Sequence, residues 1–287
     1  MLTTDKMIAN PRNTVEILKK YEFVFQKRFG QNFLIDTFVL EKIINSASIT
    51  KEDTVIEIGP GIGSMTQLLC ENAGKVFAVE IDKALIPILS DTLKDYDNLT
   101  LINADFLKLD LNEQFGSFKN IKVAANLPYY VTTPILVALL TSSLDLASVT
   151  VMVQKEVALR MKASPGSKDY GALSLFVQYY CDIDYAANVP PNCFMPRPNV
   201  GSAVVTLKRH DRPPVSDEEL LFKITRAAFN QRRKTLVNAL GNCAELGLTK
   251  PVIEEALNKL TLPAAVRGEA LTLEDFIRLT DHLYELR

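Results

Sequence analysis

Hydrophobic and polar positions alternate along the first 209 residues in a way that separates short apolar runs from amphipathic stretches. The apolar runs lie at 55–59, 75–81, 99–103, 121–126 and 149–154, and helical patterns such as 64–71 and 84–93 lie between them. Nearly continuous apolar strands that alternate with helices are typical of a parallel sheet covered on both faces. The pattern therefore predicts a doubly wound α/β fold.

The segments around this alternation predict further elements. A short helix is expected from about Asn13, and Asp36 can cap a second helix over residues 37–47. Two longer strand-like segments, 172–186 and 202–208, are joined by the proline-rich residues 190–199. Because such a pair needs no crossover helix, it predicts an antiparallel edge to the sheet.

The composition changes at residues 210–219, where two prolines precede Ser216 and Asp217. This segment is typical of a linker that leads into a capped helix, and the chain reads as helical from there on. Thr272 and Asp275 have the spacing of a capping box. We therefore predict a domain boundary near residue 209, with an α/β domain over 1–209 and a small helical domain over 210–287.

Composition and charge narrow the class of protein. The 287 residues carry a net charge of −2, which by itself indicates no nucleic-acid partner. Four scattered cysteines and two histidines make a zinc site or a disulfide framework improbable. The polar N-terminal stretch and the lack of an apolar run long enough to cross a bilayer favour a cytoplasmic protein with no membrane partner.

A glycine loop follows the first strand of the alternation, in the sequence E-I-G-P-G-I-G at 57–63. Its glycines, Gly59, Gly61 and Gly63, would let a ligand approach the backbone. Position 64, where the dinucleotide fingerprint requires a third glycine, is Ser64. A glycine turn of this kind also closes strand–helix units that bind nothing, so the loop alone is a moderate signal.

Two acidic residues at strand ends strengthen this signal. Glu80 lies 21 residues after Gly59, where a carboxylate binds ribose hydroxyls, and Asp105 follows the third strand, where it could accept from an adenine amino group. Singly, each acid is more often a solvated strand end, but with the loop they favour a nucleoside site that Ile81 and Phe106 also border. Because the loop has no basic residue, an adenosine ligand without phosphates, such as S-adenosylmethionine, fits best.

A second motif ends the strand at 121–126, where the chain reads A-A-N-L-P-Y-Y over 124–130. From the residues alone, Asn126 could cap a helix and Tyr129 could belong to the core. Four other stretches are distinctive: K-R-F-G-Q-N-F-L at 27–34, Y-G-A-L-S-L-F-V-Q at 170–178, F-M-P-R-P-N-V-G-S-A-V at 194–204 and F-N-Q-R-R-K-T-L at 229–236.

With the glycine loop, Glu80 and N-A-D at 103–105, these motifs resemble the Rossmann-type methyltransferases of the rRNA adenine N6 class over nearly the whole chain. Within that class they are most similar to the bacterial small-subunit adenine dimethyltransferases. The resemblance implies a Rossmann-like seven-stranded class I methyltransferase sheet with a small C-terminal helical domain, and S-adenosylmethionine as cofactor. It also implies a monomer that dimethylates two adjacent adenines in the 3′-terminal hairpin of 16S rRNA, within the small ribosomal subunit or its precursor.

The chemistry of N6 methylation gives the second motif a role. The lone pair of the adenine amino group is delocalised into the ring, so acceptors for both N6 hydrogens would favour a nucleophilic, tetrahedral nitrogen. Asn126 can supply a side-chain oxygen and Leu127 or Pro128 a carbonyl, while Tyr129 can stack on a base taken out of its helix. The resemblance further implies that Phe194 stacks on the other face of the base, and that Gln31, Asn32, Leu34 and Asn126 border the cofactor.

Local positive charge predicts where RNA binds. Residues 222–234 contain five basic and no acidic residues, and Lys223, Arg226, Asn230 and Arg233 have the spacing of one helix face. A solvated face is the ordinary meaning of such a run. Given the adenine site, we expect phosphate contacts from Lys27, Arg28, Lys155, Arg160, Lys162, Arg197, Lys223, Arg226, Arg232, Arg233 and Lys234, with Lys168 beside them.

Three other functions fit parts of the sequence. A large-subunit rRNA adenine methyltransferase of the macrolide-resistance type would share the same motifs. An assembly factor that checks immature small subunits, with methylation secondary, would use the same basic residues. A small-molecule amine methyltransferase would leave the basic stretch at 222–234 without a role.

Overall fold

The computed structural model describes residues 4–286 and all of their side chains except those of Thr4 and Lys27. It divides the chain into two compact units. The first comprises the residues up to 158 together with 183–209, and the second comprises 159–182 and the residues from 210. One boundary thus falls between Arg209 and His210, but residues 159–182, which precede it in the chain, belong to the second unit.

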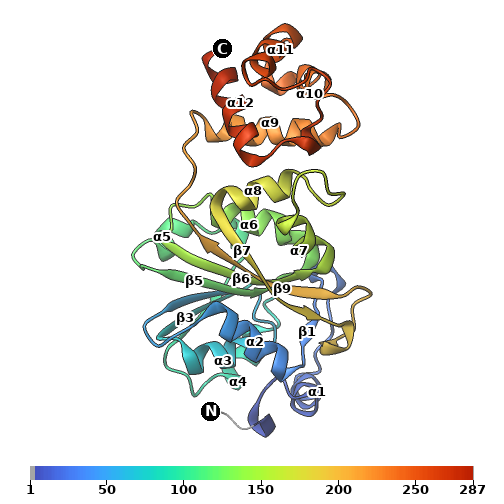
Figure 1. Cartoon of the computed structure of the whole chain (residues 1–287). Coiled ribbons are helices and arrows are strands. Elements are labelled where there is room, and N and C mark those ends of the chain that lie inside the picture. Colours follow the sequence, from blue (N-terminus) through green and yellow to red (C-terminus); the bar gives the residue numbers. More distant parts are fainter. Residues whose placement is uncertain (1–3, 287) are drawn as a thin grey trace. The chain divides into compact units, whose positions relative to one another are not determined.

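The first unit is built on a seven-stranded sheet, which confirms the predicted fold class (Figure 1). β2, β3, β4, β5 and β6 are parallel, and β9 pairs antiparallel with β6. The strands follow the order β4 (Leu99–Asn103), β3 (Lys75–Glu80), β2 (Thr54–Ile58), β5 (Ile121–Asn126), β6 (Leu146–Gln154), β9 (Ser202–Arg209) and β7 (Cys181–Val189). The chain reverses its direction across the sheet between β2 and β5, which is where such folds bind ligands.

Helices cover both faces of this sheet, as Figure 1 shows. On one face lie α2 (Thr37–Ala47), α3 (Ser64–Asn72) and α4 (Ile86–Thr92); on the other lie α5 (Leu111–Phe115) and α6 (Thr132–Leu140). Adjacent strand residues such as Val55 and Ile56 are both fully buried, as a sheet covered on two faces requires. The carboxylate of Asp36 accepts from the N–H of Val39 at 3.1 Å and so begins α2 where the sequence predicted.

The N-terminal segment forms α1 (Pro11–Lys20) and then β1 (Phe33–Leu34). β1 pairs antiparallel with β8 (Phe194–Met195), a strand from the proline-rich segment. The chain stretch between α1 and β1 is thereby fixed beside the sheet through residues more than 150 positions away in the sequence.

The prediction of one strand over 172–186 was wrong. Residues 172–180 form a helix, α8 (Ala172–Tyr180), and β7 begins directly after it at Cys181. The run A-L-S-L-F-V-Q-Y-Y is apolar on most sides, and its helix buries residues all round, among them Leu173, Leu175 and Val177. A short, continuously apolar segment of this kind does not distinguish a buried strand from a buried helix by periodicity.

The second unit is helical. α9 (Glu218–Asn230), α10 (Leu236–Gly241), α11 (Lys250–Lys259) and α12 (Leu273–Glu285) follow the linker. The side chain of Asp217 caps α9, and Thr272 and Asp275 form the predicted capping box at the start of α12. Leu221, Ile224 and Ala228 are buried along α9, as the sequence indicated.

α9 ends at Asn230, so it is shorter than the predicted helix, which included Arg233. Residues 231–233 form a turn, and α10 starts only after its cap at Thr235. Lys223, Arg226 and Asn230 therefore share a helix, whereas Arg233 lies beyond its end and does not extend the basic face.

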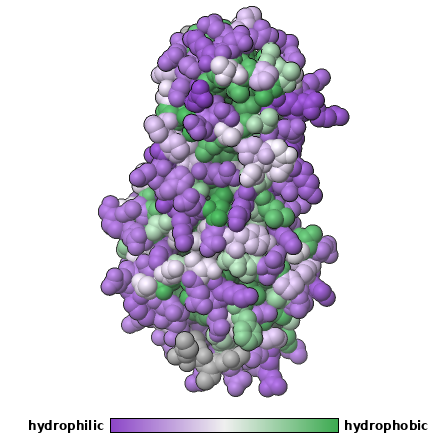
Figure 2. Space-filling view, viewed as in Figure 1, coloured by the Kyte–Doolittle hydropathy of each residue, from purple (hydrophilic) through white to green (hydrophobic). Residues whose placement is uncertain are grey.

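Hydrophilic residues predominate on the face shown in Figure 2, and apolar side chains are scattered among them. Within residues 4–286, none of the helices combines the length and the apolar character that crossing a membrane would require.

Candidate cofactor and substrate site

A pocket opens at the carboxyl ends of β2, β3, β4 and β5, at the point where the strand order reverses. It brings together side chains that the sequence analysis assigned from five separate stretches. The predicted residues that line it are Gln31, Asn32, Leu34, Gly59, Gly61, Glu80, Ile81, Asp105, Phe106, Asn126, Leu127, Pro128 and Tyr129. Gly63 and Phe194 lie outside the lining.

The three loop glycines have positive φ angles of 72° at Gly59, 62° at Gly61 and 95° at Gly63. A Cβ atom on Gly59 would project into open space, whereas one on Gly61 would lie 2.9 Å from the ring of Phe33. Gly63 begins α3, and its Cβ would approach Leu93 at 3.0 Å. Gly59 thus keeps the pocket floor open to a ligand, while Gly63 permits close packing beneath it.

Glu80 ends β3 with its carboxyl group at the pocket. One oxygen accepts from the N–H of Asp82 at 2.8 Å and the other from the N–H of Gly61 at 3.3 Å. Burial raises the pKa of Glu80 to about 7, and these backbone donors act in the opposite direction. The glycine loop and the predicted ribose-binding carboxylate are therefore joined directly.

Asp105 follows β4 and also lines the pocket. Its Oδ1 accepts from the N–H of Leu107 at 3.1 Å, which caps the short helical turn that begins at Phe106. The apolar side chains of Ile81 and Leu107 are 44% and 42% exposed at the same edge of the pocket. This edge offers two apolar surfaces and one acceptor, a combination that suits a purine base.

The sequence analysis missed Glu57, which lies in β2 between Ile56 and Ile58 and is fully buried. It lines the pocket, and neither oxygen of its carboxyl group has a hydrogen-bond partner within residues 4–286. Burial raises the pKa of Glu57 to about 8; the neighbouring hydroxyl of Thr66 acts in the opposite direction, and the charge of Glu80 adds to the increase. The sequence did contain a signal for this residue, because burying a carboxyl group inside an apolar strand costs free energy unless a ligand or partner contacts it.

Replacing Glu57 with glutamine is expected to stabilise the free protein at high pH. The pKa of Glu57 in the folded protein, about 8, exceeds the ordinary value of 4.5. The free energy of unfolding of the wild type is therefore highest below pH 4.5 and falls as pH rises through 8. At about 1.4 kcal/mol per pKa unit, the upper limit of the gain is about 5 kcal/mol. Urea unfolding of wild type and Glu57→Gln at pH 6 and pH 9 measures it, with the exposed Glu41→Gln as control. Equal pH dependence in all three proteins would contradict the prediction.

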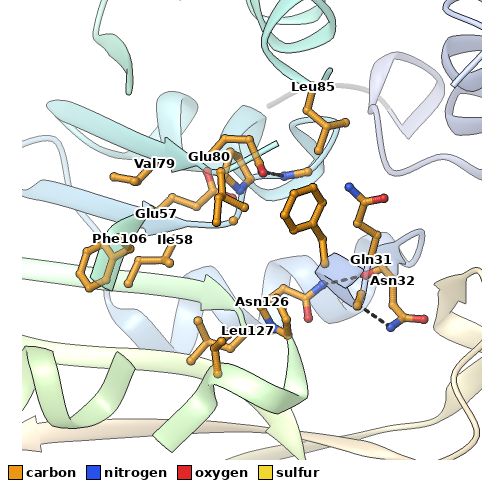
Figure 3. Close-up of a pocket in the computed structure, with 18 of the residues that line it drawn as sticks. Gln31, Asn32, Glu57, Ile58, Val79, Glu80, Leu85, Phe106, Asn126 and Leu127 are labelled. Carbon is orange, nitrogen blue, oxygen red and sulfur yellow. Dashed lines mark hydrogen bonds between the residues drawn. The ribbon is translucent and has the colours of Figure 1, made fainter. Parts of the chain in front are cut away.

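Asn126 ends β5 and faces the N-terminal segment across the pocket (Figure 3). Its amide nitrogen donates to the main-chain carbonyl of Asn32 at 3.0 Å. This hydrogen bond fixes which side of the amide is nitrogen, and it leaves the Oδ1 as the acceptor that the side chain can present to a ligand.

In the turn after Asn126, the main-chain carbonyls of Leu127 and Pro128 differ in whether hydrogen bonds within the turn already occupy them. The carbonyl of Pro128 accepts from the N–H of Val131 at 3.1 Å and from the hydroxyl of Thr132 at 3.4 Å. A carbonyl oxygen has two lone pairs, so these contacts occupy it. The carbonyl of Leu127 is therefore the better second acceptor for an amino group.

The two tyrosines of the motif have different environments. The hydroxyl of Tyr129 makes a 2.9 Å hydrogen bond with that of Ser202, which holds the ring at the pocket wall. The side chain of Tyr130 is 60% exposed at the rim, and partial burial together with the charge of Asp105 raises its pKa. Phe194 is only 4% exposed and packs in the hydrophobic core with Leu34, so the structure does not bring it to the pocket.

Most of the side chains predicted to bind RNA are exposed, which phosphate contacts require. Arg28 donates to Gln26 and lies over the ring of Phe29. Lys223 pairs with Glu219 at 2.6 Å, and the side chain of Lys27 lies outside the described residues. The exposed predicted residues are Arg28, Lys155, Arg160, Lys162, Lys168, Arg197, Arg226, Arg233 and Lys234.

Arg232 has internal partners instead. Its guanidinium pairs with Glu269 at 2.8 Å and donates to the carbonyls of Ser167 and Lys168 at 2.9 and 2.6 Å. It thus ties the loop before α8 to the C-terminal helices within the second unit. These contacts give Arg232 a structural role, and its contact with RNA stays a prediction.

The strand order of the sheet, with β9 antiparallel among parallel strands, defines a class I methyltransferase, the class that takes its methyl group from S-adenosylmethionine. The pocket at the reversal point fits that cofactor, since Gly59 leaves room along the loop and buried carboxyl groups face the pocket. More narrowly, the chain belongs to the ribosomal RNA adenine dimethylase family, whose sequence pattern matches residues 22–279.

Similar proteins span nearly the whole chain. A protein of Lachnoclostridium phytofermentans named ribosomal RNA small subunit methyltransferase A is 61% identical, over 97% of this chain and 98% of its own. Its namesake from Bacillus pumilus is 50% identical over the same shares. Among solved structures, a dimethyladenosine transferase from Plasmodium falciparum has a TM-score of 0.72 at 26% identity, covering 86% of this chain and 95% of its own. The 23S rRNA methyltransferase ErmE has a TM-score of 0.66 at 24% identity, over 88% and 100%, and shares the fold.

Proposed function

We propose that this protein transfers methyl groups from S-adenosylmethionine to N6 of two adjacent adenines in the 3′-terminal hairpin of 16S rRNA, within the small subunit or its precursor. The observation that carries the proposal is the amide of Asn126, which its bond to Asn32 orients with the oxygen as free acceptor. The names and high identity of the bacterial relatives support the small subunit as the substrate. We further propose that the protein acts as a monomer.

The end of β5 can make an adenine amino group reactive. Asn126 Oδ1 and the carbonyl of Leu127 would accept the two N6 hydrogens, which draws the nitrogen lone pair out of conjugation with the ring. Pro128 restricts Leu127 to an extended conformation and so fixes the direction of its carbonyl. These acceptors are in place before the substrate arrives, and such preorganisation is a major source of rate enhancement.

The remaining pocket residues would hold the cofactor and the base. Glu80 would accept the ribose hydroxyls, and Asp105 would accept the adenine amino group between Ile81 and Leu107. Tyr129 would stack on the extruded target base, because N6 cannot be reached inside a stacked helix. When bound, S-adenosylmethionine supplies an electrophilic methyl group on a positively charged sulfur, and orientation supplies much of the acceleration.

The exposed basic residues of the second unit are proposed to bind phosphates. Replacing Arg233 and Lys234 with glutamine is expected to weaken binding to small-subunit RNA, and to reduce the slope of log affinity against log salt concentration by about 1.5. Affinity for S-adenosylhomocysteine should not change, because neither residue lines the pocket. Filter binding at several salt concentrations measures the effect, with Lys259→Gln on α11 as control. An unchanged slope would contradict the assignment of these residues.

The proposed substrate is tested by transfer of a labelled methyl group to ribosomal subunits from cells that lack this activity. We expect label in the small subunit only, and mass spectrometry of its nucleosides should identify N6,N6-dimethyladenosine at two neighbouring positions. Label in large-subunit RNA would place the protein with the resistance methyltransferases. Tight binding to small subunits without label would favour an assembly factor in place of an enzyme.

A further inference from the structure

Residues 29–32 line the pocket, and two side chains of the segment from Gln26 to Asn32 donate hydrogen bonds to Asp82. This residue follows β3 and is only 3% exposed. Its Oδ2 accepts from the amide nitrogen of Gln31 at 2.8 Å, and its Oδ1 from that of Gln26 at 3.4 Å. A second contact to Oδ1 comes from the N–H of Ala84 at 3.1 Å, within the turn that precedes α4.

These contacts belong to a continuous set of hydrogen bonds. The N–H of Gln26 donates to the Oε1 of Gln31 at 2.8 Å, so the side chain of Gln31 is held at both ends. The N–H of Asp82 in turn donates to Glu80 at 2.8 Å. Asp82 therefore connects the carboxyl group that faces the cofactor with the chain segment that borders it.

The same segment reaches the end of β5. Asn32 follows Gln31, and its carbonyl is the group that accepts from the amide of Asn126. The placement of Gln31 thus determines where this carbonyl lies, and the carbonyl determines how the Asn126 amide is oriented. A displaced segment would disturb the cofactor pocket and the proposed acceptor together.

We propose that Asp82 is a positioning residue that holds residues 26–32 against the cofactor pocket, and that it couples cofactor binding at Glu80 to the orientation of Asn126. The part of this inference that concerns Asn126 rests on the proposed function. The part that concerns the cofactor rests on the geometry of the pocket alone. A simple role in capping the turn at Ala84 is the alternative.

Exchanging the donor and the acceptor between Asp82 and Gln31 distinguishes the positioning role from the turn-capping role. Asp82→Asn can keep an oxygen for Ala84, but it places an amide nitrogen opposite the amide nitrogen of Gln31, where two donors meet. Gln31→Glu places two carboxylates together. The double variant restores one donor and one acceptor and keeps the net charge, while an oxygen at position 31 still accepts from the N–H of Gln26.

The measured quantities are the dissociation constant for S-adenosylhomocysteine, by calorimetry, and hydrogen exchange of the amides in 26–32. We expect each single variant to bind about tenfold more weakly, with faster exchange in this segment, and the double variant to recover to within about threefold of wild type. Asp110→Asn, which alters the cap of α5, serves as the control for folding. Wild-type affinity in Asp82→Asn, or no recovery in the double variant, would overturn the inference.

Neither measurement needs RNA, so the inference and the proposed substrate can fail separately. Recovery of cofactor binding in the double variant, with no methylation of small subunits by wild type, would sustain the role of Asp82 and reject the substrate.

Discussion

Replacing Asn126 with alanine is expected to lower kcat for RNA methylation by about 10²–10³-fold, the cost of removing one preorganised group from a transition state. The side chain contributes an acceptor for N6 that the protein has already oriented through Asn32. Affinity for S-adenosylhomocysteine should fall far less than kcat, because Glu80, Asp105 and the glycine loop remain. Single-turnover methyl transfer to small subunits, with calorimetry of S-adenosylhomocysteine binding, measures both quantities.

Two further variants make this result specific. Asn126→Asp keeps oxygen acceptors but loses the donor to the Asn32 carbonyl, so we expect it to be impaired as well, although less than alanine. Asn45→Ala removes an exposed amide from α2 and should leave the rate unchanged. A rate within threefold of wild type for Asn126→Ala would mean that the amide does not contact the reacting nitrogen.

Much of the site could be predicted because the sheet concentrates chemistry at one edge. Strands read from apolar runs end at Glu80, Asn103 and Asn126, and the carboxyl ends of parallel strands meet at that edge. Their order in space did not need to be known, since every polar residue after such a strand reaches the same region. Local sequence was therefore enough to place the glycine loop near the two strand-end acids.

The sequence did not predict the strand boundary at Cys181 or the surroundings of Arg232 and Phe194, because these depend on residues distant in the sequence. α8 and β7 share one apolar run, and only tertiary packing decides where the helix ends. Arg232 belongs to a basic stretch in sequence, yet Glu269 and two loop carbonyls bind it. The sequence did not predict a strand in the proline-rich segment that contains Phe194. In the structure, β8 pairs with β1 there, and the side chain of Phe194 is buried in the core.

Replacing Glu80 with glutamine is expected to weaken S-adenosylhomocysteine binding about 10²-fold at pH 8 and to remove its dependence on pH. Burial raises the pKa of Glu80 to about 7, so the free protein holds a proton there at pH 6 and a carboxylate at pH 8. Ribose hydroxyls donate more strongly to a carboxylate than to a neutral acid. Wild type should therefore bind about tenfold more tightly at pH 8 than at pH 6, in proportion to the ionised fraction.

The sign of this dependence follows from linkage. A ligand that prefers the ionised carboxyl group must displace its proton, so affinity rises with pH up to the pKa and is constant above it. Calorimetry at half-unit steps from pH 5.5 to 8.5 should give a rise that levels off near pH 7 for wild type and for the exposed control Glu113→Gln, and a flat profile for Glu80→Gln. Glu57, with its pKa of about 8, would extend the rise to higher pH if it also faced the cofactor, and the Glu57→Gln variant isolates that contribution. A flat profile in wild type would mean that the cofactor does not contact the Glu80 carboxylate.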